Sequence, residues 1–369
     1  MRRSAWLNLI APVIAVAVAL LACSVLIVLS TDRSPAFVYG KMWEFGSTSA
    51  SMGSAINRAV PLYLSAVAVA IGFKMGLFNI GVEGQYRLAV LIAAWAGAQV
   101  TLPAPLHVGF IIVVAMVTGG LWAALPAVLK VSRGINEVIS TIMLNAIATG
   151  LAAWLFDSFL SVKDDTLSPS TKDLPASALM PDLGRIGKSD PVTGWALGAL
   201  VLGVVFAVVV WRTRFGFDLR ASGANPTAAR VSGIPAKAMI ARALILSGAV
   251  AGLVGLPALQ SDLGHYSNDL PIGLGFSGIA VALLGRNNPA GMGVAALLFG
   301  ILDRSALVLD LEGIPREVVR IMQAVIVLAV VIAYEVVGRW QQRRIQNQIG
   351  SATARVDTHG GPAAEVAPA

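Results

Sequence analysis

Two groups of polar side chains interrupt otherwise apolar sequence and are candidates for chemistry. The first lies in residues 76–85, GLFNIGVEGQ, where Asn79, Glu83 and Gln85 supply an amide, a carboxylate and a second amide. Three glycines in this stretch would interrupt a helix, so the polar groups either line a pathway for a solute or satisfy broken backbone. A translocation pathway, a structural gate and simple backbone satisfaction are all consistent with this group.

The second group lies in residues 134–145, GINEVISTIMLN. On a helix Glu137, Thr141 and Asn145 recur every four residues and share one face, with Asn136 beside them. A polar stripe on an apolar helix faces protein or water rather than lipid. It therefore predicts either hydrogen bonding between helices or contact with a solute.

Two strings imitate nucleotide sites but lack the context that such sites need. Residues 273–278, GLGFSG, fit GxGxxG, yet they open an apolar segment and follow no strand, so we expect helix packing or a helix break. Residues 184–189, GRIGKS, lack the first glycine of a P-loop, because Asp182 occupies its position. The three histidines are widely separated and show no metal-binding or protease spacing. We therefore expect a chain that is not an enzyme and holds no cofactor or metal of its own.

The elements that position these groups are predicted to be membrane-spanning helices. The chain is 56% hydrophobic and only 13% charged, with a mean hydropathy of +0.76, which excludes an ordinary water-soluble domain. The pattern predicts an all-α, polytopic transmembrane bundle with broken helices and about ten spans, near residues 6–29, 59–72, 86–101, 106–129, 136–158, 192–211, 239–259, 273–285, 291–309 and 318–337. The second and eighth are short and flanked by glycines, which favours discontinuous helices.

Charge in the connecting segments predicts the orientation of the bundle. Lys and Arg concentrate in alternate connections, and Asp residues gather in the long connection after the fifth span. Because basic loops stay inside, both termini are expected in the cytoplasm. The same rule places residues 212–237, the largest basic insertion, on the cytoplasmic side as a docking surface, and it explains the net charge of +7 without nucleic acid.

The two ends of the chain are interpreted from composition. Cys23, the single cysteine, lies in an apolar run that continues to Leu29, so we expect an uncleaved first helix rather than a lipoprotein signal. Residues 346–369 are rich in Ala, Gly, Thr and Pro and predict a disordered cytoplasmic tail after a transmembrane permease domain of residues 1–345.

Several predicted spans lack charge altogether. Residues 88–129, 138–156, 192–211 and 243–259 contain no Asp, Glu, Lys or Arg, whereas ion-coupled carriers commonly hold acidic groups near the midplane. Asp303 beside Arg304, in the predicted span at 291–309, predicts a local or interhelical charge pair. Energy is therefore expected to come from outside the chain.

Three ordered motifs carry a family resemblance. They are FNIGVEGQ (residues 78–85), GINEVISTIMLN (134–145) and LRASGANPTAARVSGI (219–234). From about residue 58 to 337 the chain resembles the inner-membrane permease subunits of ATP-binding-cassette importers. The resemblance is to the branch of ribose and branched-chain amino acid permeases, particularly the nucleoside and simple-sugar permeases.

This resemblance implies a set of partners in a bacterial cytoplasmic membrane. They are a cytosolic ATPase that binds ATP and Mg²⁺, an extracytoplasmic substrate-binding lipoprotein, and a second permease subunit. The Glu83 motif and the chain length favour a different paralogue as that second subunit over a second copy. The surrounding membrane lipid is a further contact.

The resemblance also implies that residues 223–234 form a coupling helix seated in a groove of the ATPase. Local chemistry agrees with a short helix: Asn225 suits its cap, Pro226 its first turn and Gly233 its end. The remaining implied coupling positions are Gly223, Ala228, Ala229 and Ile234. An ion-coupled secondary transporter and, beyond it, a membrane-embedded enzyme are the alternatives.

Overall fold

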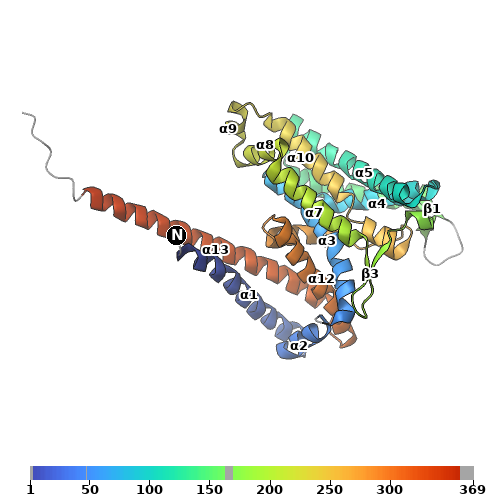
Figure 1. Cartoon of the computed structure of the whole chain (residues 1–369), viewed down its shortest axis with the longest axis horizontal. Coiled ribbons are helices and arrows are strands. Elements are labelled where there is room, and N and C mark those ends of the chain that lie inside the picture. Colours follow the sequence, from blue (N-terminus) through green and yellow to red (C-terminus); the bar gives the residue numbers. More distant parts are fainter. Residues whose placement is uncertain (1–2, 47, 163–168, 358–369) are drawn as a thin grey trace, which may run out of the picture.

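Helices make up most of the computed structural model, which describes residues 3–46, 48–162 and 169–357 (Figure 1). The α-helices are α1 (Arg3–Ser30), α2 (Pro35–Gly46), α3 (Ser49–Lys74), α4 (Val82–Gln99), α5 (Ala104–Arg133), α6 (Glu137–Leu155), α7 (Trp195–Arg212), α8 (Arg214–Ala224), α9 (Pro226–Val231), α10 (Ala236–Ala251), α11 (Leu274–Leu284), α12 (Pro289–Leu311) and α13 (Arg316–Asp357). Two π-helical turns, η1 (Phe156–Leu160) and η3 (Ala258–Leu263), extend α6 and follow α10, and a short 3-10 turn, η2 (Ala176–Ala178), lies before α7.

The predicted number of spans is not confirmed. Every predicted apolar segment is mostly helical, but within the described residues only five helical segments are long and apolar enough to cross a membrane: α3, α5, α6 with η1, α7 and α12. A sixth crossing is possible if residues 16–30 of α1 and the whole of α2 form one span, bent by 111°. Short apolar helices buried within a protein have the same composition as spans, so composition alone does not fix the number of crossings.

The second predicted span is longer than the sequence indicated. We expected a short, discontinuous helix at 59–72, but α3 is one helix of 26 residues with Pro61 inside it. Its first turns are rich in serine and include Arg58, which hid them from the apolar count. The prediction of a short eighth segment is confirmed, because α11 has 11 residues and begins after Gly273 in the left-handed conformation, at φ 88°.

Four short strands accompany the helices in the long connection between α6 and α7. Strands β1 (Ser161–Val162) and β2 (Ser170–Thr171) pair antiparallel, and so do β3 (Asp182–Arg185) and β4 (Pro191–Thr193). A β-bridge between Ser170 and Ser267 ties this connection to the segment after η3. The fold is therefore helical, and its short strands lie in the connection between α6 and α7.

Glycines allow α5 and α10 to pack backbone against backbone. A Cβ atom added to Gly119 would collide with the carbonyl oxygen of Gly248, and one added to Gly252 would collide with that of Ala115. Small residues are the usual means of close helix approach in membranes, where no hydrophobic drive brings helices together. Gly119, Gly248 and Gly252 therefore permit the close contact between these two helices.

The last helix leaves the bundle. α13 has 42 residues, which corresponds to about 63 Å at 1.5 Å per residue. It runs alongside α1, and its C-terminal part extends away from the remaining helices (Figure 1). It continues to Asp357, into the segment where the sequence predicted a tail from residue 346. The rest of that predicted tail, residues 358–369, lies outside the described residues, and the division of the chain into domain and tail stays a prediction.

Candidate translocation site

The turn between α3 and α4 is held by a buried amide network. The Asn79 Nδ2 donates to Ser247 Oγ at 2.9 Å and to Gln85 Oε1 at 3.1 Å, and its Oδ1 accepts from the backbone N–H of Gly81 at 2.9 Å. Ser247 in turn donates to the carbonyl oxygen of Ala68 at 2.6 Å. Asn79, Gln85 and Ser247 are all buried, so their partners are needed to offset desolvation. The network fixes α3, α4 and α10 to one another.

Glu83 connects α4 to the start of α11. Its Oε1 accepts from Gly273 N at 2.8 Å and its Oε2 from Gly275 N at 2.9 Å. The hydroxyl of Tyr86 donates to Oε1 at 3.0 Å. A carboxylate suits the N-terminus of a helix, where backbone N–H groups lack intrahelical acceptors. The absence of a side chain on Gly275 permits the contact, because a Cβ there would lie 2.5 Å from Glu83 N.

The second polar group also binds backbone. Asn145 accepts from Gly84 N and donates to the carbonyl oxygen of Ile80, both at 2.9 Å, and so joins α6 to the first turn of α4. Asn136 caps α6 by accepting from Val138 N at 2.8 Å.

Two members of this group lie on the first turns of α6. The Thr141 hydroxyl donates to the carbonyl oxygen of Glu137 at 2.6 Å. Glu137 itself forms an ion pair with Lys130 of α5, with 2.7 Å between Oε2 and Nζ. Glu137 and Thr141 are buried, as Asn145 is, and the predicted common face is therefore turned into the protein.

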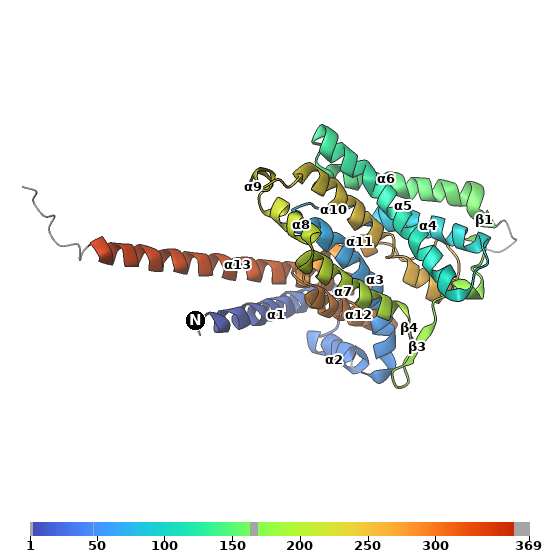
Figure 2. The same cartoon turned by 45° about the horizontal axis from the view of Figure 1, so that its top comes forward.

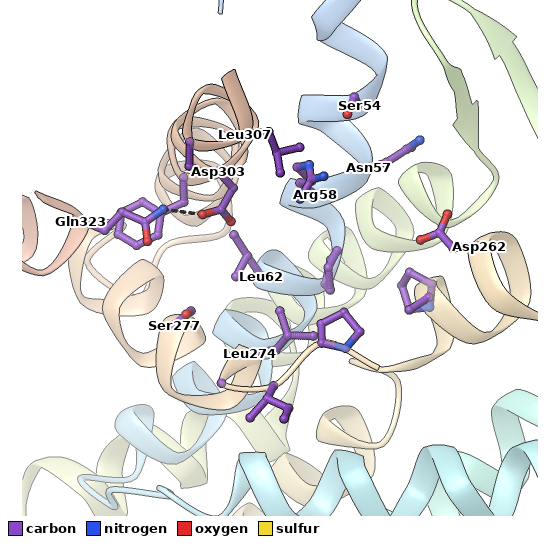
Figure 3. Close-up of a pocket in the computed structure, with 18 of the residues that line it drawn as sticks. Ser54, Asn57, Arg58, Leu62, Asp262, Leu274, Ser277, Asp303, Leu307 and Gln323 are labelled. Carbon is purple, nitrogen blue, oxygen red and sulfur yellow. Dashed lines mark hydrogen bonds between the residues drawn. The ribbon is translucent and has the colours of Figure 1, made fainter. Parts of the chain in front are cut away.

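A large cavity lies apart from both polar groups. It has a volume of about 950 Å³ and is enclosed by α3, η3, α11, α12, the start of α13 and the β3–β4 hairpin (Figure 3). None of the seven predicted pathway residues lines it: Asn79, Glu83, Gln85, Asn136, Glu137, Thr141 and Asn145 all lie outside its wall. Their contact with a solute stays a prediction. Glu83 does act on the cavity indirectly, since the segment it holds at Gly273 forms part of the wall.

Charged and amide side chains that the sequence interpretation did not assign to the pathway face this cavity. Arg58 of α3 and Asp262 of η3 are both exposed to it. Across the cavity, Gln323 of α13 donates through Nε2 to Asp303 Oδ1 of α12 at 2.8 Å (Figure 3). Partial burial raises the pKa of Asp262, and the positive charge of Arg58 opposes this.

Two of these residues have weak signals in the sequence. Arg58 is the one charged residue in the first part of α3, where an isolated base beside an apolar run is also typical of a span end. The sequence predicted a charge pair of Asp303 with Arg304, but Asp303 accepts a hydrogen bond from Gln323, 20 residues later. No local pattern indicates that these residues converge.

The predicted coupling segment, residues 223–234, contains the last two residues of α8 and the whole of α9. Asn225 caps α9 by accepting from Thr227 N and Ala228 N, both at 3.0 Å. α9 is followed by Gly233 in the left-handed conformation, at φ 80°, and Ile234 N donates to the carbonyl oxygen of Ala229 at 2.9 Å. The caps predicted from sequence are therefore confirmed.

The implied coupling positions on α9 do not all face outward. Ala229 is buried within this chain, whereas Ala228 and Pro226 are exposed and Val231 is 87% exposed. Gly223 lies against the backbone of Lys74 and Met75 at the end of α3. The segment is thus rigidly tied to α3 and presents Ala228 and Val231 outward.

The coupling segment and the cavity lie at opposite ends of the bundle. α7 starts two residues after β4 and ends two residues before α8, and its 18 residues span about 27 Å. Figure 2 shows α8 and α9 at one end and the β3–β4 hairpin at the other. A movement at one end therefore reaches the other only through the long helices.

Comparison with known families decides the identity of this arrangement. The family described as "Branched-chain amino acid transport system / permease component" matches residues 51–331. The chain belongs to this family. This permease component is a multi-pass membrane protein of an ABC transporter and is not itself an ATPase, as its sequence predicted.

Several permeases are similar to this family member along most of their length. The guanosine ABC transporter permease NupP of Bacillus subtilis is 35% identical over 336 residues, covering 89% of this chain and 94% of NupP. The glucose ABC transporter permease TsgB13 of Haloferax volcanii is 33% identical over 88% of this chain and 87% of its own. The nucleoside ABC transporter permease NupB of Lactococcus lactis is 30% identical over 81% of this chain and 86% of its own. No solved structure matches the permease.

Proposed function

We propose that this permease subunit translocates nucleosides or simple sugars across a bacterial cytoplasmic membrane. Support comes from the relatives, whose names give guanosine, glucose and nucleosides as their solutes. The similarity of 30–35% covers most of each chain but does not choose among these solutes. Both termini are proposed to lie in the cytoplasm, in keeping with the distribution of Lys and Arg.

The observation that carries the mechanism is the capped α8–α9 segment at one end of the bundle with a polar cavity at the other. We assign α9 as the coupling helix of this permease, the element that contacts a separate cytosolic ATPase. That ATPase would hold ATP and Mg²⁺. The exposed face of α9, with Ala228 and Val231, is the proposed contact. Asn225, Pro226 and Gly233 shape the helix, while Gly223, Ala229 and Ile234 attach it to the chain.

Transport would then proceed by alternating access. Movement of α9 with the ATPase displaces α8, and α8 is bonded at Thr213 to the end of α7 and touches α3 at Gly223. Because α3 forms one wall of the cavity, this path connects the ATPase to the opposite face. A second permease subunit, expected to be a different paralogue, would supply the facing wall, and an extracytoplasmic binding lipoprotein would deliver the solute.

The test is uptake by the assembled transporter. The permease, its paralogue and the ATPase are reconstituted in liposomes with ATP inside, and labelled guanosine and glucose are offered with the binding protein. Uptake of either solute that persists after proton and sodium gradients are collapsed, and that stops when the ATPase loses its P-loop lysine, is expected. Uptake that follows an ion gradient and ignores the ATPase would contradict the proposal and favour a secondary transporter.

A further inference from the structure

The cavity described above presents hydrogen-bonding groups that the protein itself does not use. Arg58 and Asp262 form no hydrogen bond or ion pair with the part of the chain that the structure describes. The hydrogen bond between Gln323 and Asp303 uses one oxygen of Asp303 and the amide nitrogen of Gln323. The second carboxylate oxygen and the amide oxygen remain as acceptors. Asn57, by contrast, is occupied, because it bonds Pro191 and Thr193 of β4.

These groups face the same cavity from separate elements. The charge of Arg58 acts on both Asp262 and Asp303, and Figure 3 shows Arg58 between the two carboxylates, directed into the cavity. A guanidinium group offers several donors, whereas a carboxylate accepts from two hydroxyl groups at once. Two adjacent hydroxyl groups on a ring match this combination of acceptors and donors.

The overall charge of the wall excludes several solutes. Four carboxylates and three guanidinium groups line it: Asp182, Asp190, Asp262, Asp303, Arg58, Arg316 and Arg320. Arg316 is also neutralised by Asp310, with 2.8 Å between Nε and Oδ2. A phosphorylated anion would meet a surplus of carboxylates, and a cation would meet Arg58. A neutral solute avoids both costs.

An apolar surface lies beside the polar groups. Phe276 is 51% exposed and Ile272 67% exposed, and both line the cavity with Leu62 and Leu274. Apolar walls with a few convergent polar groups are typical of small-molecule sites, and the volume of about 950 Å³ lies within the range of such sites. A sugar ring or a nucleobase offers the apolar ring face that this wall would cover.

We propose that the cavity binds an uncharged solute through a vicinal diol, which is present in the ribose of a nucleoside and in a free aldose. Asp303 and Asp262 accept the hydroxyl hydrogens, and Arg58 donates to the hydroxyl oxygens. The proposal deepens the function proposed above and rests on it, because it makes this cavity the transporter's own solute site, separate from that of the binding protein.

A cysteine reporter inside the cavity tests the proposal. Ser277 lies on the wall (Figure 3), and the native Cys23 is 1% exposed, so a maleimide reports on Ser277→Cys with little background. The variant is assembled with the second permease and the ATPase in membranes without binding protein. Labelling rates are compared with millimolar inosine, its 2′,3′-dideoxy analogue and D-glucose. Thr101→Cys, at an exposed position outside the cavity, is the control.

A diol-bearing solute should slow labelling of Ser277→Cys about threefold when present at twice its dissociation constant. Slowing by inosine identifies a nucleoside site, and slowing by glucose alone identifies a sugar site. The dideoxy analogue should have no effect, and Asp303→Asn should abolish the protection. Equal protection by the dideoxy analogue, equal slowing of Thr101→Cys, or no slowing by either diol would overturn the proposal.

Parallel uptake measurements keep the two proposals apart. If the native complex imports inosine or glucose with ATP and yet the reporter shows no protection, the solute site is wrong and the proposed function stands. If the complex imports neither solute, the proposed function fails, whatever the reporter shows.

Discussion

Replacement of Glu83 by glutamine should loosen the start of α11 without disturbing the rest of the bundle. Glu83 accepts from Gly273 N, Gly275 N and the hydroxyl of Tyr86 at 2.8–3.0 Å. Glutamine has nearly the same shape but only one acceptor oxygen. One of the two backbone N–H groups therefore faces an amide NH₂ instead of an acceptor.

The expected cost follows from the type of bond that is lost. A hydrogen bond to a charged group contributes about 1.5–3 kcal/mol, so a loss of about 2 kcal/mol corresponds to roughly 30-fold in the opening equilibrium. Hydrogen exchange of the amides from Gly273 to Gly278, followed by mass spectrometry, should accelerate by about that factor. The segment forms part of the cavity wall, so uptake should also fall.

Glu137→Gln provides a matched control. It removes one carboxylate, which is paired with Lys130 on α5 rather than with α11, and should leave exchange at residues 273–278 unchanged. If Glu83→Gln leaves that exchange within about threefold of the native rate, a difference below 1 kcal/mol, the carboxylate does not hold α11 and our interpretation is wrong.

Three further variants test the packing and the coupling segment. Ala229→Glu should reduce the yield of folded protein because Ala229 is buried, whereas Ala228→Glu should fold normally and lose the ATPase in co-purification; the reverse pattern would refute our assignment of the α9 faces. Gly248→Val should prevent the approach of α5 and α10 and lower the melting temperature, with Gly150→Ala, which meets no neighbour within 4 Å, as the unaffected comparison. Asn145→Ala leaves the Gly84 N–H and the Ile80 carbonyl without their partner and should destabilise the protein by about 2–4 kcal/mol in denaturant unfolding; a cost below 1 kcal/mol would mean that these bonds contribute little.

The features that sequence predicted well are local. The caps of α9 at Asn225 and Gly233 depend on neighbouring residues, and so does the start of α11 at Gly273. Apolar segments were located for the same reason. The number of crossings is not confirmed, because apolar helices such as α4 and α11 are at least partly buried and sequence alone does not separate burial in protein from contact with lipid.

The cavity could not be predicted because it is assembled from distant residues. Arg58, Asp262, Asp303 and Gln323 come from four separate elements, and nothing in the spacing of one element indicates the position of another. The motif residues were predicted as pathway candidates because they are polar groups within apolar sequence. In the structure such groups are mostly bonded to backbone, as Asn145 and Glu83 are.

ATP-dependent uptake by the complete transporter tests the central claim most directly. Liposomes that contain this permease, its partner subunits and internal ATP should accumulate labelled guanosine or glucose after all ion gradients are collapsed, and Ala228→Glu should abolish that accumulation. Accumulation that requires an ion gradient, or that continues at the native rate in Ala228→Glu, would contradict an ATPase-driven permease coupled through α9.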